Sequence, residues 1–217
     1  MFLHDIWPKA RIGLYCEWYR EEALAAEVFD PEFPVAEQET AVYRLRFRNL
    51  NAALHVDMAT AGITPTRFQL ASYPKVWQDL TSVIHDEIDT RFVCPNPDGA
   101  LEISGDLTLT RNDEVISFIN RNLEPSCGYH QFMRVLPHLL RARPHAQVVV
   151  LGGDAVSYGA APAGVGSWRQ LYLGEVRGDI SDADWAWVHF WVACLAAAFY
   201  RCFRSAAHIF TSSIRLC

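Results

Sequence analysis

The run Gln147-Val148-Val149-Val150-Leu151, followed at once by Gly152-Gly153-Asp154, decides the fold class of this 217-residue chain. A run of apolar residues without polar alternation is typical of a parallel strand covered on both faces. Apolar spacing predicts an amphipathic helix over residues 129–143 before this run and another helix over residues 168–176 after it. Strands that alternate with helices in this way indicate an α/β protein with doubly wound parallel sheets.

The same alternation extends through the rest of the chain. Short apolar runs predict strands over residues 11–15, 80–84 and 114–120. A helix is expected over residues 37–61, where Val42, Leu45, Leu50 and Leu54 recur at helical spacing, with Gly62 as its C-cap. Ile63-Thr64-Pro65-Thr66 is interpreted as a strand end that leads into a helix with Thr66 as its N-cap.

Composition changes near residues 95–112, where Pro95-Asn96-Pro97-Asp98-Gly99 carries strong turn chemistry. We therefore expect one α/β unit over residues 1–97, a second over residues 98–190, and an apolar tail over residues 191–217. The tail adjoins the run Trp185–Tyr200, which only His189 interrupts. This run is shorter than the roughly 18–20 residues that a membrane-spanning helix needs, so a membrane-associated segment is kept as an alternative.

The overall composition excludes some classes of protein. Half of the residues are apolar (51%), a fifth are charged (20%), and the formal net charge is −6. This balance fits a globular protein and gives no electrostatic footprint for nucleic acid. The six cysteines form no Cys-x-x-Cys pair, and no signal-peptide pattern occurs at the start, so we expect a cytoplasmic protein without a zinc site.

Ligands of open α/β sheets bind at the carboxyl ends of the strands, and two predicted strand ends carry suggestive residues. The first is Arg121-Asn122-Leu123-Glu124-Pro125-Ser126-Cys127-Gly128, which leads into a helix. An arginine beside a helix N-terminus can hold a diphosphate through its forked donors and the free backbone N–H groups. The alternative is that Arg121 pairs with Glu124 inside a loop.

The second strand end, Gly152-Gly153-Asp154, is a weak nucleotide signal that also fits an ordinary tight turn. A third polar segment, His85-Asp86-Glu87-Ile88-Asp89, could bind a metal, but a solvated turn is the better interpretation, so we predict no metal ion and no cofactor. None of the common nucleophile or zinc-hydrolase motifs is visible, and the catalytic residues are not assigned.

Five of these segments occur together in the order seen in one family. They are Phe29-Asp30-Pro31-Glu32-Phe33-Pro34, Gly62-Ile63-Thr64-Pro65-Thr66-Arg67-Phe68-Gln69, Val83-Ile84-His85-Asp86-Glu87-Ile88-Asp89-Thr90, Arg121-Asn122-Leu123-Glu124-Pro125 and Val150-Leu151-Gly152-Gly153-Asp154. In this order they resemble the bacterial group 1, or family 4, retaining glycosyltransferases over roughly residues 1–190.

The resemblance implies two Rossmann-like domains, with a glycan or lipid-linked acceptor on the first and a nucleotide-sugar donor on the second. It implies transfer without a metal, in the cytoplasm or at the inner face of the cytoplasmic membrane. Arg121 and Gly128 then match the residues that contact the donor diphosphate. The resemblance places Asn122, Glu124, Gly152, Gly153 and Asp154 near the donor cleft, and His85 and Asp86 at the interdomain turn.

The chain also departs from the family pattern. Cys127 stands where a second diphosphate-binding Arg or Lys is usual, and Glu87 stands where glycine is usual. Loss of one such contact costs about 2–4 kcal/mol of transition-state stabilisation. We also expect both domains to be incomplete, because the family's first strand and its donor-site glutamate pair are not found. We interpret the tail as a shifted reading frame, with a genuine, divergent C-terminal helix as the alternative. Impaired transfer is therefore expected, with an inactive remnant or a membrane-associated binding module as alternatives.

Overall fold

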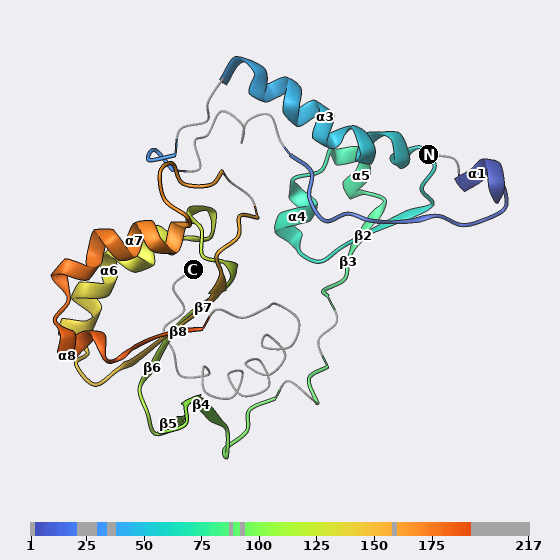
Figure 1. The fold of residues 1–217 in the computed structure, drawn as a ribbon. Coiled ribbons are helices and arrows are strands. Elements are labelled where there is room, and N and C mark those ends of the chain that lie inside the picture. The colour runs from blue at the N-terminus through green and yellow to red at the C-terminus, as the bar shows by residue number, and fades with distance from the viewer. Residues whose placement is uncertain are drawn as a thin grey trace. The chain divides into compact units, whose positions relative to one another are not determined.

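The computed structural model describes residues 3–20, 30–33, 38–86, 89–91, 94–157 and 160–191. The chain divides into two compact units, residues 1–87 and 88–217, whereas the sequence placed the division after residue 97. Each unit combines helices with a three-stranded parallel sheet (Figure 1). The predicted α/β class with parallel sheets is therefore confirmed.

The first unit contains a sheet of order β1-β2-β3, in which both strand pairs are parallel. Its described elements are α1 (Leu3–Ile6), β1 (Gly13–Tyr15), α3 (Gln38–Val56), β2 (Ala61–Thr64), α4 (Arg67–Ala71), α5 (Lys75–Gln78) and β3 (Thr81–Val83).

The core of the first unit lies on one face of this sheet. Cys16, Tyr73 and Trp77 form its buried cluster, and the rings of Tyr73 and Trp77 stack with centroids 5.6 Å apart. Thr66 begins α4 as predicted, since its hydroxyl oxygen accepts a hydrogen bond of 3.1 Å from the backbone N–H of Gln69. This cap satisfies one of the free N–H groups of the first helical turn.

Two expectations for the segment before β2 are wrong. The helix predicted to reach residue 61 ends at Val56, and Gly62 lies inside β2 and caps no helix. The glycine is needed for a different reason: a Cβ atom at position 62 would lie 2.5 Å from Oγ1 of Thr81 on the neighbouring strand. Close approach of β2 and β3 therefore excludes a side chain there.

The second unit contains a sheet of order β6-β7-β8, again parallel throughout. Its described elements are β4 (Ala100–Ser104), β5 (Leu107–Thr110), β6 (Val115–Asn122), the 3₁₀ turn η1 (Pro125–Cys127), α6 (Tyr129–Ala142), β7 (Gln147–Gly153), α7 (Trp168–Val176), the 3₁₀ turn η2 (Arg177–Asp179), α8 (Asp182–Trp185) and β8 (Val188–Trp191).

The central strand β7 is the run that predicted the fold class. Residues 147–152 are buried, as expected of a strand covered on both faces. On one face, Phe118 packs against Phe132 of α6 with ring centroids 4.9 Å apart. On the other face, Leu101 and Leu109 of the antiparallel β4–β5 hairpin join Val149 and Leu151 in a buried cluster. A hairpin therefore covers the face on which a doubly wound unit would carry helices.

The apolar run near the end of the chain is only partly described. Its first residues form the end of α8 and the strand β8, which pairs with β7. Residues 192–217, which make up nearly all of the predicted tail, lie outside the described part of the chain. None of the helices that the structure describes has the length and apolar character needed to cross a bilayer.

Candidate functional site

The loops that follow β6 and β7 begin side by side at the carboxyl edge of the second unit's sheet. Asn122 pairs with Gly153 in the ladder, after an irregularity between Ile119 and Asn122. The backbone N–H of Leu123 then donates to the carbonyl of Gly153 over 2.9 Å. The two segments that the sequence marked separately, residues 121–128 and 152–154, thus lie together at this edge.

Gly152 and Gly153 allow this close approach. A Cβ atom at position 152 would lie 2.7 Å from Cδ2 of Leu123 and 3.0 Å from the carbonyl oxygen of Asn120. One at position 153 would lie 2.6 Å from Oδ1 of Asn122. The glycine pair therefore has a packing reason within the unit, and its predicted place in a donor cleft stays a prediction.

Asn122 and Glu124 are buried and are joined to the loop after β7 through Ser157. The Asn122 side-chain amide donates to the Ser157 hydroxyl over 2.6 Å, and the Ser157 backbone N–H donates to the Glu124 carboxylate over 3.1 Å. Ser157 was missed by sequence reasoning, because no motif marks it and only the folded strand order places it here. These bonds fix the position of the segment that carries Arg121.

Arg121 itself is exposed. Its backbone N–H donates to the side chain of Asn120 over 2.9 Å, and its guanidinium forms no ion pair with any residue that the structure describes. The pairing with Glu124 that sequence reasoning kept as an alternative is therefore not formed. Arg121 lies near the end of β6, with its guanidinium open to a ligand.

Gly128 connects η1 to α6 in a left-handed conformation, with φ 78° and ψ 10°. A Cβ atom there would meet nothing within 4 Å, so glycine is favoured by backbone conformation and not by space. No side chain caps α6. Its first-turn N–H groups therefore lack the usual side-chain acceptor at the edge where ligands bind in such sheets. Cys127, directly before Gly128, is partly buried.

Asp154, the last predicted donor-cleft residue, is held in a bidentate ion pair. Its two carboxylate oxygens accept from Nε and Nη2 of Arg169 over 2.8 and 2.5 Å. The pKa of Arg169 is raised, chiefly by this hydrogen bond. Arg169 lies in the first turn of α7, fifteen residues after Asp154, and sequence reasoning gave it no role.

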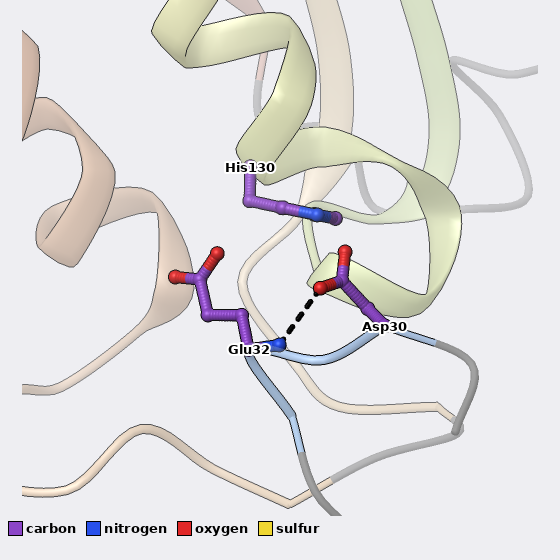
Figure 2. A group of neighbouring side chains, drawn as sticks. All are labelled: Asp30, Glu32 and His130. Carbon is purple, nitrogen blue, oxygen red and sulfur yellow. Dashed lines mark hydrogen bonds between the residues drawn. The ribbon is translucent and has the colours of Figure 1, made fainter.

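The side chains of Tyr129 and His130, at the start of α6, are deeply buried. The Tyr129 hydroxyl has no hydrogen-bond partner in the described part of the chain, and burial raises its pKa. His130 follows on the same turn, and Figure 2 draws its side chain. The ring centroids of His130 and Tyr172 are 6.2 Å apart. Neither side chain was singled out by sequence reasoning.

In the first unit, Tyr15 and Asp86 meet at the carboxyl edge of the sheet. The Tyr15 hydroxyl donates to Oδ1 of Asp86 over 2.7 Å, and Nδ1 of His85 lies 3.0 Å from the Asp86 carbonyl oxygen. His85 and Asp86 are exposed. Glu87 lies outside the described residues. The interdomain role of His85 and Asp86 stays a prediction.

The segment that opens the family resemblance contains an Asx turn. The backbone N–H of Glu32 donates to Oδ1 of Asp30 over 2.9 Å, as Figure 2 shows. Such a bond fixes a turn locally, which fits the proline between the two residues. Phe29 and Pro34, at the ends of the same motif, lie outside the described residues.

A cavity of ≈ 510 Å³ opens between α3 and the segments after β1 and α4 in the first unit. Tyr19, Arg20, Asn49 and Tyr73 are among the residues that line it. Asn49 fixes this wall, because its side-chain oxygen accepts from the Arg20 backbone N–H over 3.0 Å and its amide donates to the Arg20 carbonyl over 2.7 Å. The cavity offers aromatic faces and a guanidinium to a polar ligand.

These features define an α/β protein with polar loops at the carboxyl edges of two parallel sheets. Residues 1–93 match the family model of the glycosyl transferase family 4 group. The predicted resemblance to this family is therefore confirmed over residues 1–93, which make up less than half of the chain.

A solved structure that resembles the chain is the crystal structure of an α,α-trehalose 6-phosphate synthase from Burkholderia multivorans. The identity is 13%, the TM-score is 0.47, and the match covers 97% of this chain and 46% of the synthase. The chain thus spans about half the length of that protein. At this TM-score the fold assignment rests on the strand order and register described above. No curated protein sequence matches the chain significantly.

Proposed function

We propose that this chain takes part in the transfer of a sugar from a nucleotide-sugar donor to a glycan or lipid-linked acceptor. The observation that carries the proposal is that two groups follow β6 closely in the chain: Arg121, whose guanidinium pairs with no described residue, and the start of α6 at Gly128, which no side chain caps. Both lie at the carboxyl edge of a parallel sheet, where ligands of such folds bind.

The chemistry of the transfer fits these groups. When the bond between the sugar and the diphosphate breaks, the leaving nucleoside diphosphate keeps the bonding electrons and gains negative charge. A guanidinium and the N–H groups of a helix N-terminus stabilise that charge without reorganisation. Asn122, Glu124 and Ser157 would position these donors and would not touch the sugar, because their polar atoms bind one another.

Cys127 weakens the proposed diphosphate site. A thiol supplies no positive charge at the position where the family pattern carries a second basic residue. We therefore propose weak donor binding and slow transfer, and a catalytically inactive remnant is the second candidate. The proposal includes no metal ion and no cofactor, so chelation by EDTA is expected to leave donor binding unchanged.

Titration calorimetry of the full chain with UDP and GDP tests the donor site. Arg121→Ala should weaken binding about tenfold or more, as expected when a charge-assisted hydrogen bond is lost. Arg111→Ala, which removes an exposed arginine near the β4–β5 hairpin, is the matched control and should bind as the parent does. Equal affinity of the Arg121→Ala variant and the parent would remove Arg121 from the site.

Cys127→Arg tests whether the chain is impaired at this position. The substitution should tighten binding of the nucleoside diphosphate and raise donor-dependent sugar transfer. Cys94→Arg, which adds the same charge at an exposed cysteine, is the control. Transfer that stays undetectable in parent and variant, together with unchanged diphosphate binding, would favour the inactive remnant.

For the acceptor we propose the first unit, on the support of its cavity lined by Tyr19, Tyr73 and Arg20. Tyrosine faces stack on sugar rings and a guanidinium pairs with phosphate, the two groups that a lipid-linked glycan presents. We also propose that the protein works in the cytoplasm and at the inner face of the cytoplasmic membrane. Arg20→Ala, which removes an exposed side chain of this lining, should raise the KM for the acceptor more than that for the donor.

A further inference from the structure

The strand β6 forms one edge of the second unit's sheet. It pairs with β7 on one side, and on its other side it pairs with no strand in the part of the chain that the structure describes. Residues 116–120 are accordingly half-buried, whereas residues 147–152 of β7 are buried. With eight residues, β6 is also the longest of the described strands. Such an edge presents a row of N–H and C=O groups with which another strand can pair.

The bonds to β7 show which backbone groups of β6 face outward. The carbonyl of Glu114 accepts from the N–H of Gln147, and the parallel register continues with Ile116 opposite Val148. Along a strand, the backbone groups of successive residues point to opposite sides, so every second residue of β6 bonds to β7. The outward-facing N–H and C=O groups are those of Val115, Ser117 and Ile119.

This edge lacks the features that usually keep an edge strand unpaired. Proteins protect such strands with Pro, with charged side chains or with bulges. Residues 115–119 contain no Pro and no charged residue, and the ladder becomes irregular only between Ile119 and Asn122. The side chains of Val115 and Ile119 join the cluster beneath the β4–β5 hairpin, so packing fixes the backbone of this segment. A preorganised edge loses little conformational freedom when it pairs.

The two ends of the edge carry opposite charges. Asp113 and Glu114 precede the first outward-facing residue, Arg121 follows the last one, and all three are exposed. Glu114 already pairs with Arg143, whereas Asp113 accepts hydrogen bonds only from neighbouring groups of Thr110 among the described residues. Two antiparallel copies of β6 would bring the acidic end of each strand beside the basic end of the other.

We propose that β6 pairs with the β6 strand of a second copy of this chain, antiparallel and about a two-fold axis at Ser117. In this register Ser117 lies opposite its own copy, and Val115 lies opposite the second copy's Ile119. Pairs of this kind exchange two backbone hydrogen bonds each, so about six bonds satisfy every outward-facing group. Both copies use the same surface, as in most closed dimers.

The charges select this arrangement. In the proposed register Arg121 of one copy lies across from Asp113 of the other, at both ends of the interface. A parallel pairing would instead set Arg121 beside Arg121 and Asp113 beside Asp113, and like charges directly opposite each other are destabilising. The inference goes beyond the proposed sugar transfer and does not depend on it, because backbone groups carry the pairing.

Size-exclusion chromatography with light scattering, over a concentration series of the full chain, tests the dimer. The parent should have the mass of two chains at high concentration and should dissociate on dilution. Ser117→Pro removes an outward-facing N–H without removing a bond to β7, so it should abolish the dimer. Ser117→Ala keeps this N–H and is the matched control, which should dimerise as the parent does. Circular dichroism checks that the variants fold.

An exchange of charges tests the register. Asp113→Arg and Arg121→Asp should each raise the dissociation constant of the dimer about tenfold or more, because like charges then face each other. The double variant Asp113→Arg/Arg121→Asp should dimerise as the parent does. Both positions are exposed, so these variants decide the matter even where Ser117→Pro does not fold.

Hydrogen exchange locates the contact. The amide protons of Ser117 and Ile119 should exchange slowly in a concentrated sample and quickly in a dilute one, whereas that of Val149 in the central strand should not change. Three results would overturn the proposal. They are a parent that is monomeric at every concentration, a dimer that folded Ser117→Pro and Asp113→Arg both leave intact, and protection of Ser117 and Ile119 in a monomer, which would mean that the same chain covers this edge.

Discussion

The hydroxyl of Tyr15, at the end of β1, donates a hydrogen bond of 2.7 Å to the carboxylate of Asp86, 71 residues later and just after β3. The strand β2 lies between these two strands in the sheet, so the bond joins the carboxyl ends of the outer strands. It thereby holds the segment that leaves the first unit against the edge of its sheet.

This bond raises the pKa of Tyr15 above its ordinary value of 10.0, with smaller contributions from burial and from the charges of Asp86 and Glu17. Asp86→Ala removes the acceptor and its charge, so the pKa of Tyr15 should fall towards 10.0. Glu17→Ala should lower it less. A pH titration of tyrosine carbon signals by NMR, with Tyr15→Phe to assign the resonance, measures both shifts. A larger shift for Glu17→Ala would contradict this account.

Gly128 should tolerate no other residue without strain, although there is room for a side chain. Its φ of 78° costs an L-residue about 1 kcal/mol, so Gly128→Ala should lower the free energy of unfolding by that amount. Gly174→Ala is the matched control inside α7, where a Cβ atom also meets nothing within 4 Å. It should stabilise the protein by about 0.5–1 kcal/mol. Urea unfolding of the second unit measures both, and the same sign for the two changes would refute the assignment.

Gly152 should also not tolerate a side chain, but here the cause is lack of space and not backbone conformation. Gly152→Ala would place Cβ 2.7 Å from Leu123 and 3.0 Å from a backbone oxygen, which cannot move without shifting β6. We expect a loss of about 1–3 kcal/mol, typical of overpacking. Gly105→Ala, in the open turn of the β4–β5 hairpin, should change stability by less than about 0.5 kcal/mol. Urea unfolding compares the two, and an unaffected Gly152→Ala variant would mean that β6 and β7 separate easily.

His189 should make the second unit sensitive to mild acid. Burial lowers its pKa from 6.5, and its ring lies 2.7 Å from the side-chain oxygen of Gln147. The unfolded chain therefore binds a proton more readily than the folded one. The stabilisation is complete above about pH 6.5 and is lost as the pH falls through the lower, folded-state pKa. His189→Gln should reduce the drop in melting temperature between pH 7.5 and pH 5.5, as measured by circular dichroism. An identical drop would assign the acid sensitivity to other groups.

Local signals in the sequence predicted the elements that depend on local physics. The apolar run of β7, the hydroxyl of Thr66 at an N-cap and the apolar spacing of α6 each act within a few residues, and the structure places all three as expected. The β4–β5 hairpin had a signal too, in alternating residues around Gly105, but it was interpreted as a change of domain. The hairpin's role depends on the folded sheet, because Leu101 and Leu109 cover a face of β7 that no helix covers.

Contacts between loops could not be predicted in the same way. The bond of Asn122 to Ser157 depends on the register of β6 against β7, which no single segment encodes. The ion pair of Asp154 with Arg169 depends on how the chain returns from β7 into α7. The helix α3 shows a related limit. Apolar residues at helical spacing predict a helix, but they do not say which of two apolar faces turns inward.

The contact at Gly62 has a consequence for the way the first unit presents its polar turn. A Cβ atom at position 62 would lie 2.5 Å from Oγ1 of Thr81, and this hydroxyl donates to the Trp77 carbonyl over 2.8 Å. The strand β3 leads within two residues of Val83 to His85 and then Asp86. A single added methyl group at position 62 would therefore act at a distance, by displacing the side chain of Thr81 at the start of the strand that carries these two residues to the sheet's edge.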